Sequence, residues 1–213
     1  MDIKERIAGK AHELFMRFGF RSVSMDDIAN HLGMSKKTLY QYFTDKDALV
    51  DAVLDREVCD TEADCKTMQH DADNAVHELL LTMDEIHEQF SNMNPMVLYD
   101  LEKFHPKAWQ KFLKHKNQFL YKIIRDNIER GINEELYRPE INVDVMSRFR
   151  LESMMVMFNV DVFPPNKYNL GVVTQETMEH YLYGLANLKG HKLIIKYKEE
   201  RLKKTTDEKH TRK

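Results

Sequence analysis

Residues 24–42 carry two helix-start signals on either side of one glycine, and this arrangement constrains the fold more than any other feature of the chain. Ser24 is followed three positions later by Asp27, and this pair forms a capping box that starts a short helix. Gly33 supplies the unhindered backbone for a sharp turn, and Ser35 then caps a second short helix. Apolar residues recur at helical spacing between the signals: Ile28, Ala29 and Leu32. The pattern predicts a helix-turn-helix.

The second helix of this motif, residues 36–42, has one apolar anchor, Leu39, and leaves polar and aromatic side chains to point outward. A helix that enters the major groove of DNA needs groups that meet base edges, which lysine, threonine and glutamine provide. Tyrosine hydroxyls and further lysines suit phosphate oxygens. A solvated helix face also exposes lysines, so the spacing alone leaves that alternative open. Thr44 with Asp47 predicts the cap of the next helix, where Lys46 adds a positive charge.

An amphipathic helix precedes the motif, with apolar residues at helical spacing and a glycine at its end: Ile7, Ala11, Leu14, Phe15, Phe18 and Gly19. Together with the run SMDDIANHLGMSKKTLYQYFTDKDALVDAVL, this segment resembles the DNA-binding domain of the tetracycline-repressor (TetR) family. The resemblance covers roughly residues 5–54, and the TLYQYF run followed by a lysine is its most specific part. The rest of the chain resembles the family only in its helical layout.

The candidate DNA-contacting residues are the polar, basic and aromatic residues of the motif: Ser24, Ser35, Lys36, Lys37, Thr38, Tyr40, Gln41, Tyr42 and Lys46. The resemblance implies that the two adjacent lysines, Thr38 and Gln41 occupy recognition-helix positions. It also implies that Tyr42 and Lys46 touch the DNA backbone and that Ser24 lies near a phosphate. We therefore expect double-stranded DNA as a partner.

The length and charge of the chain limit the classes of protein to which it can belong. A chain of 213 residues can form a small helical domain and a larger one, each with its own core. The net charge of −3 and the pI near 6.4 exclude a globally basic protein that coats nucleic acid, so DNA binding must come from local charge. No apolar run approaches the ~20 residues that cross a bilayer, and the N-terminus is acidic, so we expect a cytoplasmic protein with reduced cysteines.

Apolar residues return at three and four positions through the remainder of the chain, which predicts an all-α fold. We expect an N-terminal three-helix DNA-binding domain over residues 1–48. A larger helical domain for effector binding and dimerisation follows over residues 49–203, and a basic, disordered tail covers residues 204–213. Further helix signals include Pro106 and Asn142 as starts and Gly131 as an end.

One expected helix after residue 142 is apolar on nearly every side near its end and needs burial on two faces. We expect it to pair with a helix capped by Thr174 and to form a four-helix seam in a homodimer. The alternative is that both helices are central in the monomer. The expected dimer-interface residues are Met154, Met155, Met157, Phe158, Met178, Tyr181, Leu182 and Leu185.

Thirteen methionines and eleven phenylalanines concentrate in regions where the resemblance implies an enclosed effector. The candidate pocket residues are Met83, Phe90, Met96, Trp109, Phe112, Phe119, Met154 and Phe158. Each of them taken singly fits an ordinary core position equally well. If they line a pocket, the effector is small and largely apolar or aromatic.

The chain contains no nucleophile motif, phosphate loop or metal-binding histidine pair, so we expect no catalytic residues, no metal and no cofactor. The sequence thus favours a DNA-binding transcriptional regulator, a homodimer that acts as a repressor and that an effector releases from a palindromic operator. Two alternatives remain: an all-α enzyme, and a protein-interaction module that keeps the helix-turn-helix fold without DNA function.

Overall fold

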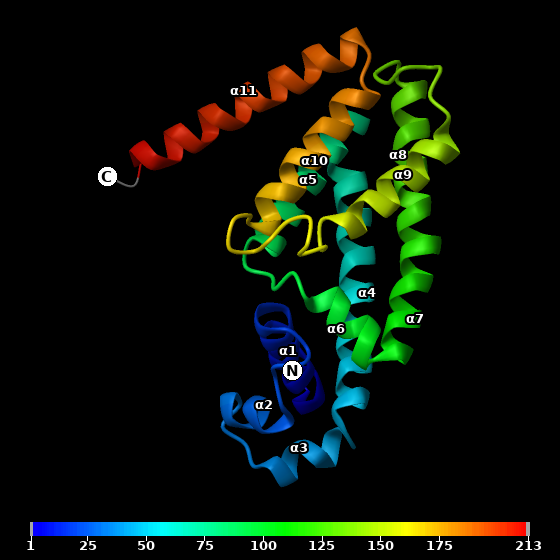
Figure 1. The fold of residues 1–213 in the computed structure, drawn as a ribbon. Coiled ribbons are helices and arrows are strands. Elements are labelled where there is room, and N and C mark those ends of the chain that lie inside the picture. Colours follow the sequence, from blue (N-terminus) through cyan, green and yellow to red (C-terminus); the bar gives the residue numbers. More distant parts are fainter. Residues whose placement is uncertain (1, 212–213) are drawn as a thin grey trace.

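The computed structural model describes residues 2–211, with side chains described as far as Arg201, and the described residues form helices and no strand. A small group of helices at one end of the molecule is joined to a larger helical body by one long helix (Figure 1). The all-α fold with an N-terminal helix-turn-helix and a larger C-terminal helical domain is therefore confirmed.

The N-terminal unit consists of α1 (Ile3–Phe18), α2 (Met25–His31) and α3 (Lys36–Tyr42). Ser24 caps α2 by accepting a hydrogen bond from the Asp27 amide, while the Asp27 carboxylate accepts from the Ser24 amide at 2.8 Å. Ser35 caps α3 by accepting from the Thr38 amide. The fully buried side chains of this unit come from every helix and include Ile7, Phe15, Ile28 and Leu39.

The long helix α4 (Lys46–Asp71) belongs to both parts of the molecule. Its cap is Asp45, which accepts from the Ala48 amide at 2.7 Å, so the predicted cap of Thr44 with Asp47 is wrong by one residue. The first turns of α4 bury Leu49, Val50, Val53 and Leu54 in the N-terminal core. That core therefore extends past residue 48, where we expected the domain to end.

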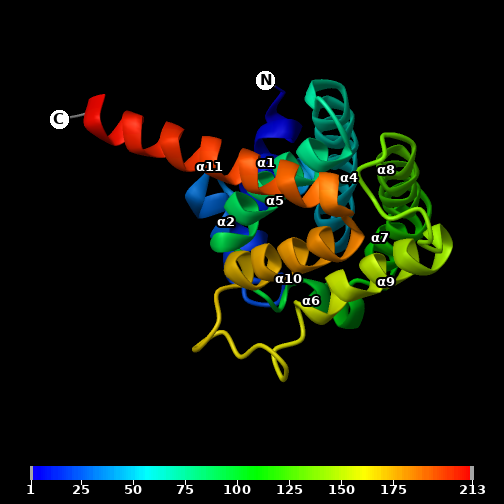
Figure 2. The same cartoon turned by 90° about the horizontal axis from the view of Figure 1, so that it is seen from above.

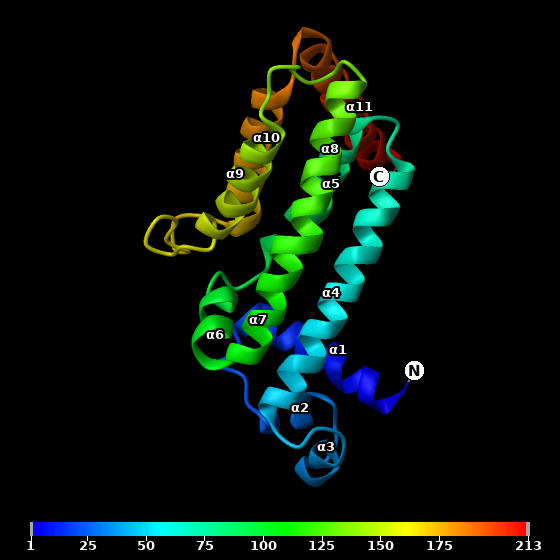
Figure 3. The same ribbon diagram turned by 90° about the vertical axis from the view of Figure 1, so that its right-hand side faces the viewer.

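The larger body contains α5 (Ala75–Ser91), α6 (Val97–Phe104), α7 (Pro106–His115), α8 (Tyr121–Asn133), α9 (Val143–Val156), α10 (Leu170–Leu185) and α11 (Leu188–Thr211). A π-helical turn, η1 (Lys116–Leu120), joins α7 to α8, so that one rod runs from residue 106 to residue 133. Helices α9 and α10 lie on the side of this body away from α4 (Figures 2 and 3).

Two other helix boundaries differ from the sequence-based expectation. Asn169 caps α10, because its side chain accepts from the Val172 amide, whereas the predicted cap Thr174 lies inside the helix and its hydroxyl donates to the Leu170 carbonyl. Helix α8 continues two residues beyond Gly131. That glycine is needed for packing instead, because a β-carbon there would lie 2.1 Å from the Tyr137 ring.

The C-terminal segment is helical where we expected disorder. Helix α11 continues to Thr211 and extends away from the body (Figure 1). The expected tail of residues 204–213 is therefore part of this helix as far as 211, and residues 212–213 lie outside the described residues.

Candidate nucleic-acid interface and ligand cavity

Helix α3 lies at the end of the molecule farthest from α8, α9 and α10 (Figures 1 and 3). Leu39 is its only buried residue and attaches the helix to the N-terminal core. Lys37 and Gln41 are exposed, and neither has a hydrogen-bond or ion-pair partner in the described part of the chain. These two side chains are free to donate to a ligand outside the protein.

The other polar residues of the motif have internal partners. Lys36 pairs with Asp26 of α2, with a shortest distance of 2.7 Å between ammonium and carboxylate, and this hydrogen bond raises the pKa of the Lys36 ammonium. The hydroxyls of Ser35 and Thr38 lie 2.8 Å apart, which holds both at the N-terminus of α3. A nucleic acid would have to share or replace these contacts.

The aromatic and basic residues that follow differ in exposure. The Tyr40 side chain is exposed, whereas Tyr42 is half-buried against the N-terminal core. Lys46 is also half-buried, and its ammonium donates to the Phe20 carbonyl. Burial lowers the pKa of Lys46. Lys46 therefore ties the start of α4 to the end of α1 and is not the freely exposed cation that the sequence suggested.

Polar contacts attach the C-terminal body to the N-terminal unit. The Asn94 amide donates to the Met16 carbonyl at 2.7 Å, at the end of α1. The Arg21 amide donates to the buried carboxylate of Asp100 on α6 at 2.9 Å. A further contact joins His105, the residue before α7, to Asp47 of α4. The contacts all meet at the junction of α1, α4 and α6.

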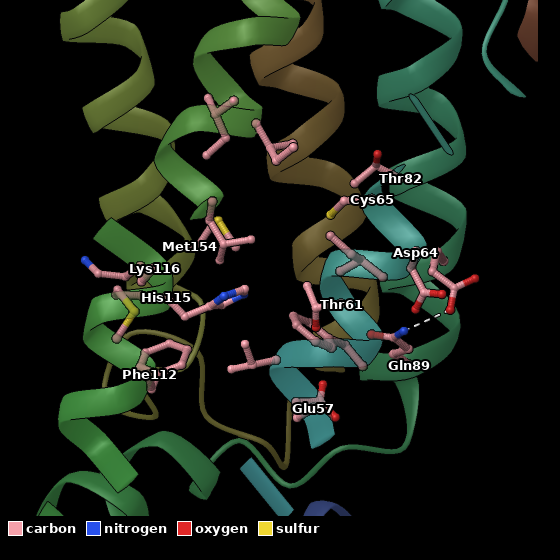
Figure 4. A pocket seen from close by; sticks show the side chains of 18 of the residues that line it. Glu57, Thr61, Asp64, Cys65, Thr82, Gln89, Phe112, His115, Lys116 and Met154 are labelled. Carbon is pink, nitrogen blue, oxygen red and sulfur yellow. Dashed lines mark hydrogen bonds between the residues drawn. The ribbon is translucent and has the colours of Figure 1, made fainter. Parts of the chain in front are cut away.

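A cavity of about 270 Å³ lies between α4, α5, α7 and α9, with walls formed mostly by apolar side chains (Figure 4). This volume is near the lower end of the range for small-molecule sites. Four of the predicted pocket residues line it: Phe90, Phe112, Met154 and Phe158. Met16 and Phe20 of the N-terminal unit also line it, so the cavity reaches the unit that carries α3.

The other four predicted pocket residues do not line this cavity. Met83 is buried in the core around α5 and α10. Trp109 stacks on Phe112 from behind the cavity wall, with ring centroids 5.2 Å apart, and Phe119 stacks on His115. Met96 lies at the start of α6. Helical spacing placed these residues in the interior but could not say which of them face a void.

Polar residues that sequence reasoning missed also line the cavity. Arg150 of α9 is only 4% exposed, and burial lowers the pKa of its guanidinium to about 10. The His115 side chain points into the cavity (Figure 4), and burial lowers the pKa of its imidazole. Arg150 lies four residues from Met146 and from Met154, on the inward side of an apolar helix, and this sequence signal could have identified it.

The turn η1 brings His115 and Lys116 to the cavity wall. A π-helical turn inserts one residue into an α-helix, which changes the direction in which the preceding side chains point. Lys116 is buried, and its ammonium donates to Glu152 of α9 at 2.5 Å. This ion pair links the middle of the α7–α8 rod to α9 beside the cavity.

The predicted dimer-interface residues do not form an open face. Met154, Met155 and Phe158 line the cavity. The remaining predicted residues are buried within the single chain: Met157, Met178, Tyr181, Leu182 and Leu185. The prediction is corrected because the inner faces of α9 and α10 are already used for the core and the cavity. The exposed face of α9 instead carries Val145, Phe149 and Val156 at helical spacing, and Phe149 is 59% exposed.

Comparison with known proteins connects this geometry to a family. The profile described as "Bacterial regulatory proteins, tetR family" matches residues 7–53. The HTH-type transcriptional regulator YvaF of Bacillus subtilis is 26% identical over 141 residues, which covers 62% of this chain and 74% of that protein. The profile match spans α2, α3 and the start of α4.

Solved structures share the whole fold. A transcriptional regulator from Saccharomonospora viridis, in complex with choline, superposes with a TM-score of 0.68 at 18% identity, covering 86% of this chain and 97% of that one. The TetR-family regulator SCO4454 from Streptomyces coelicolor gives 0.64 at 16% identity, covering 86% and 95%. At these identities the likeness shows the fold alone.

The fold, the exposed α3 and these relatives define a helix-turn-helix transcriptional regulator, which is a DNA-binding protein and not an enzyme. Residues 7–53 match the DNA-binding domain of the TetR family, and the chain as a whole shares the fold of solved TetR-family structures. Among the described residues, no cluster of three or more histidine, cysteine or acidic side chains could hold a metal ion. None of the helices in the described part is long and apolar enough to cross a membrane.

Proposed function

We propose that this chain is a homodimeric transcriptional repressor that binds a palindromic DNA operator and is released from it by a small, largely apolar effector. The observation that carries the proposal is the wall of the cavity. It includes Met16 and Phe20 from the DNA-binding unit together with residues of α4, so a ligand in the cavity touches the unit that carries α3.

The DNA surface of the proposal is α3 with its flanking residues. Lys37 and Gln41 have no partner among the residues that the structure describes and would read base edges in the major groove. Lys36, Thr38 and Tyr40 would reach DNA from the same helix, with Tyr42 beside them, while Ser24 and Ser35 lie at helix starts, where backbone amides attract phosphate. Lys46 would contribute indirectly, because its contact with the Phe20 carbonyl fixes the start of α4.

Effector release needs a route from the cavity to α3, and α4 supplies it. The first turns of α4 pack in the N-terminal core, and its later turns carry Glu57, Thr61 and Cys65 into the cavity wall (Figure 4). A ligand that fits the cavity better after α4 has shifted would move both α3 helices of a dimer. A preference of ~1–3 kcal/mol for the non-binding conformation is enough to change operator affinity by one to two orders of magnitude.

Dimerisation would use the outer face of α9 and α10. Val145, Phe149 and Val156 form an apolar stripe on α9, and the exposed Val172 extends it onto α10. Water-exposed apolar residues that continue over two neighbouring helices are typical of protein interfaces. Two-fold pairing there would form a four-helix contact and would set the separation of the two α3 helices. Paired recognition helices read half-sites about one DNA turn apart or a multiple of it.

Selection of protein-bound fragments from genomic DNA tests the proposal. We expect a two-fold symmetric site, bound by the dimer with an affinity that falls steeply with salt. Absence of duplex binding even at low salt would instead identify a protein-interaction module. A small-molecule fraction that releases the selected fragment supports effector control, and conversion of that molecule to a product would identify an enzyme.

A further inference from the structure

Arg150 is a buried cation with no counter-ion in the part of the chain that the structure describes. Its side chain lines the cavity and is 4% exposed, yet no carboxylate lies within ion-pair distance of the guanidinium among the described residues. The guanidinium donates one long hydrogen bond, of 3.5 Å, to the Ser153 hydroxyl. The guanidinium carbon also lies 5.7 Å from the centre of the Tyr181 ring.

This environment is unfavourable for the protein alone. Buried charges in proteins are normally paired with an opposite charge or fully hydrogen-bonded, because transfer of an ion from water into an apolar interior is costly. A guanidinium has five N–H donors in a planar fork, and most of them have no acceptor from the described residues in this site. With its pKa at about 10, Arg150 still carries its charge at neutral pH.

A second polar atom faces the same cavity. Nε2 of His115 is buried and has no hydrogen-bond partner among the described residues, and Figure 4 shows the ring pointing into the cavity from the α7 side. Nδ1 of this ring lies 3.7 Å from the Glu62 carboxylate. Nε2 is therefore open to a hydrogen bond with a polar group of a ligand in this cavity.

The acidic residues of the cavity wall do not supply the missing charge. Glu57 lies 2.7 Å from His12, and Glu78 is engaged by Arg130 at 3.0 Å. Glu85 accepts a hydrogen bond from Gln89, and Asp64 is exposed to water. Each of these carboxylates has a hydrogen-bond or ion-pair partner or is exposed to water, so none of them depends on a cationic ligand for a polar contact.

We propose that Arg150 is the anion-binding group of the cavity and that the effector is an amphiphilic carboxylic acid. Its carboxylate would accept two parallel hydrogen bonds from the guanidinium, the geometry that a planar fork recognises best. Its apolar chain or ring would lie among Phe90, Phe112 and Phe158. This inference rests on the proposed function, because it names the chemical class of the effector.

Binding of matched ten-carbon probes to the full-length protein, measured without DNA, tests the inference. Trp109 is the only tryptophan and stacks on Phe112 of the cavity wall, so its fluorescence reports occupancy. We expect decanoate to bind about tenfold or more tightly than decanol, because only the carboxylate forms a charge-assisted pair. Tighter binding of decyltrimethylammonium than of decanoate would overturn the inference in favour of a cationic effector.

Substitutions at Arg150 isolate the contribution of the guanidinium. Arg150→Met should weaken decanoate binding about tenfold or more and leave decanol binding within about twofold, and Arg150→Lys should give an intermediate loss. The matched control is Arg148→Met, because Arg148 lies on the same helix but is exposed and pairs with Asp144. Decanoate binding that is unchanged in Arg150→Met would reject the assignment.

Two further measurements separate this inference from the proposed function. Thermal unfolding should show that Arg150→Met folds, because replacing a buried unpaired charge by an apolar side chain is often neutral or stabilising. Operator binding by Arg150→Met should match the wild type. If operator DNA is bound and released by a neutral molecule while decanoate does not bind, the inference fails and the repressor proposal stands. If decanoate binds through Arg150 but no duplex binds, the repressor proposal fails instead.

Discussion

The buried imidazole of His105 lies with its Nδ1 2.6 Å from the carboxylate of Asp47. His105 immediately precedes α7 in the C-terminal body, and Asp47 is in the first turn of α4, next to the DNA-binding unit. The His105 ring also packs on Phe20, with ring centroids 5.8 Å apart. This one contact therefore couples the cavity wall, the end of α1 and the start of α4.

Replacing Asp47 by alanine should destabilise the chain. The His105 imidazole would remain buried with its Nδ1 unpaired, and an unsatisfied buried polar group costs about 1–3 kcal/mol. Urea denaturation followed by circular dichroism measures this loss. Asp60→Ala is the control, because Asp60 forms only an exposed pair with Arg56, worth a few tenths of a kcal/mol. Equal effects of the two substitutions would show that the His105 contact adds no stability.

Lys37→Ala should relax the sequence preference of DNA binding. A lysine that reads a base edge contributes about 1–3 kcal/mol of discrimination against the wrong base, whereas a lysine on phosphate contributes equally to all sequences. Fluorescence anisotropy with the selected operator and with single-base variants measures the difference. The control is Lys192→Ala, because Lys192 is an exposed residue on α11. This substitution should leave both the DNA affinity and the sequence preference unchanged. An unaltered sequence preference in Lys37→Ala would show that Lys37 does not contact base edges.

Phe149→Glu should convert the proposed dimer to monomer. The side chain is 59% exposed at the centre of the α9 stripe, and two-fold symmetry would bring the new carboxylates of both copies into one apolar interface. Sedimentation velocity at several concentrations measures the change. Ile195→Glu is the matched control, since Ile195 is similarly exposed but lies on α11. A Phe149→Glu dimer as stable as the wild type would show that the dimer interface is not the exposed face of α9.

Gly131→Ala should destabilise the protein, although alanine normally favours a helix. The added β-carbon would lie 2.1 Å from the ring of Tyr137, which is buried and whose hydroxyl donates to the Ala75 carbonyl. Overpacking of this kind costs about 1–3 kcal/mol or more. Gly184→Ala has open space around it in α10 and should be neutral or stabilise by up to about 1 kcal/mol. Chemical denaturation of both variants compares the two glycines.

Cys65 should react slowly with iodoacetamide. Burial, with help from the nearby Asp64 carboxylate, raises the pKa of its thiol to about 11. At pH 8 only about one thiol in a thousand is then ionised, and the labelling rate should rise about tenfold per pH unit up to that pKa. Cys59 is exposed and free, and mass spectrometry distinguishes the two sites, with Cys59→Ser isolating the slow one. Fast labelling of Cys65 at pH 8 would contradict its burial.

The helix-turn-helix could be predicted from the sequence because its capping residues and its turn depend on short-range contacts. The capping contacts of Ser24 and Ser35 each span three residues, and Gly33 adopts the positive φ of 64° that the predicted turn requires. Such contacts depend on neighbouring residues alone, so they form wherever the sequence occurs. The misplaced caps at Thr44 and Thr174 have the same origin, since nearby Asp45 and Asn169 supplied equally good acceptors.

The functional interior depended on tertiary structure. Helical spacing identified Met178 and Leu182 as apolar, but only the packing of α10 on α5 decided that they face the core and not a partner. The cavity likewise depends on where helices far apart in the chain leave space, which no local pattern encodes. The residue types and short-range hydrogen bonds determined the DNA-binding motif and the helical class. The burial of Arg150, with no counter-ion among the described residues, was decided only when α9 packed beside α8 and η1, because burial is a property of all the neighbours together.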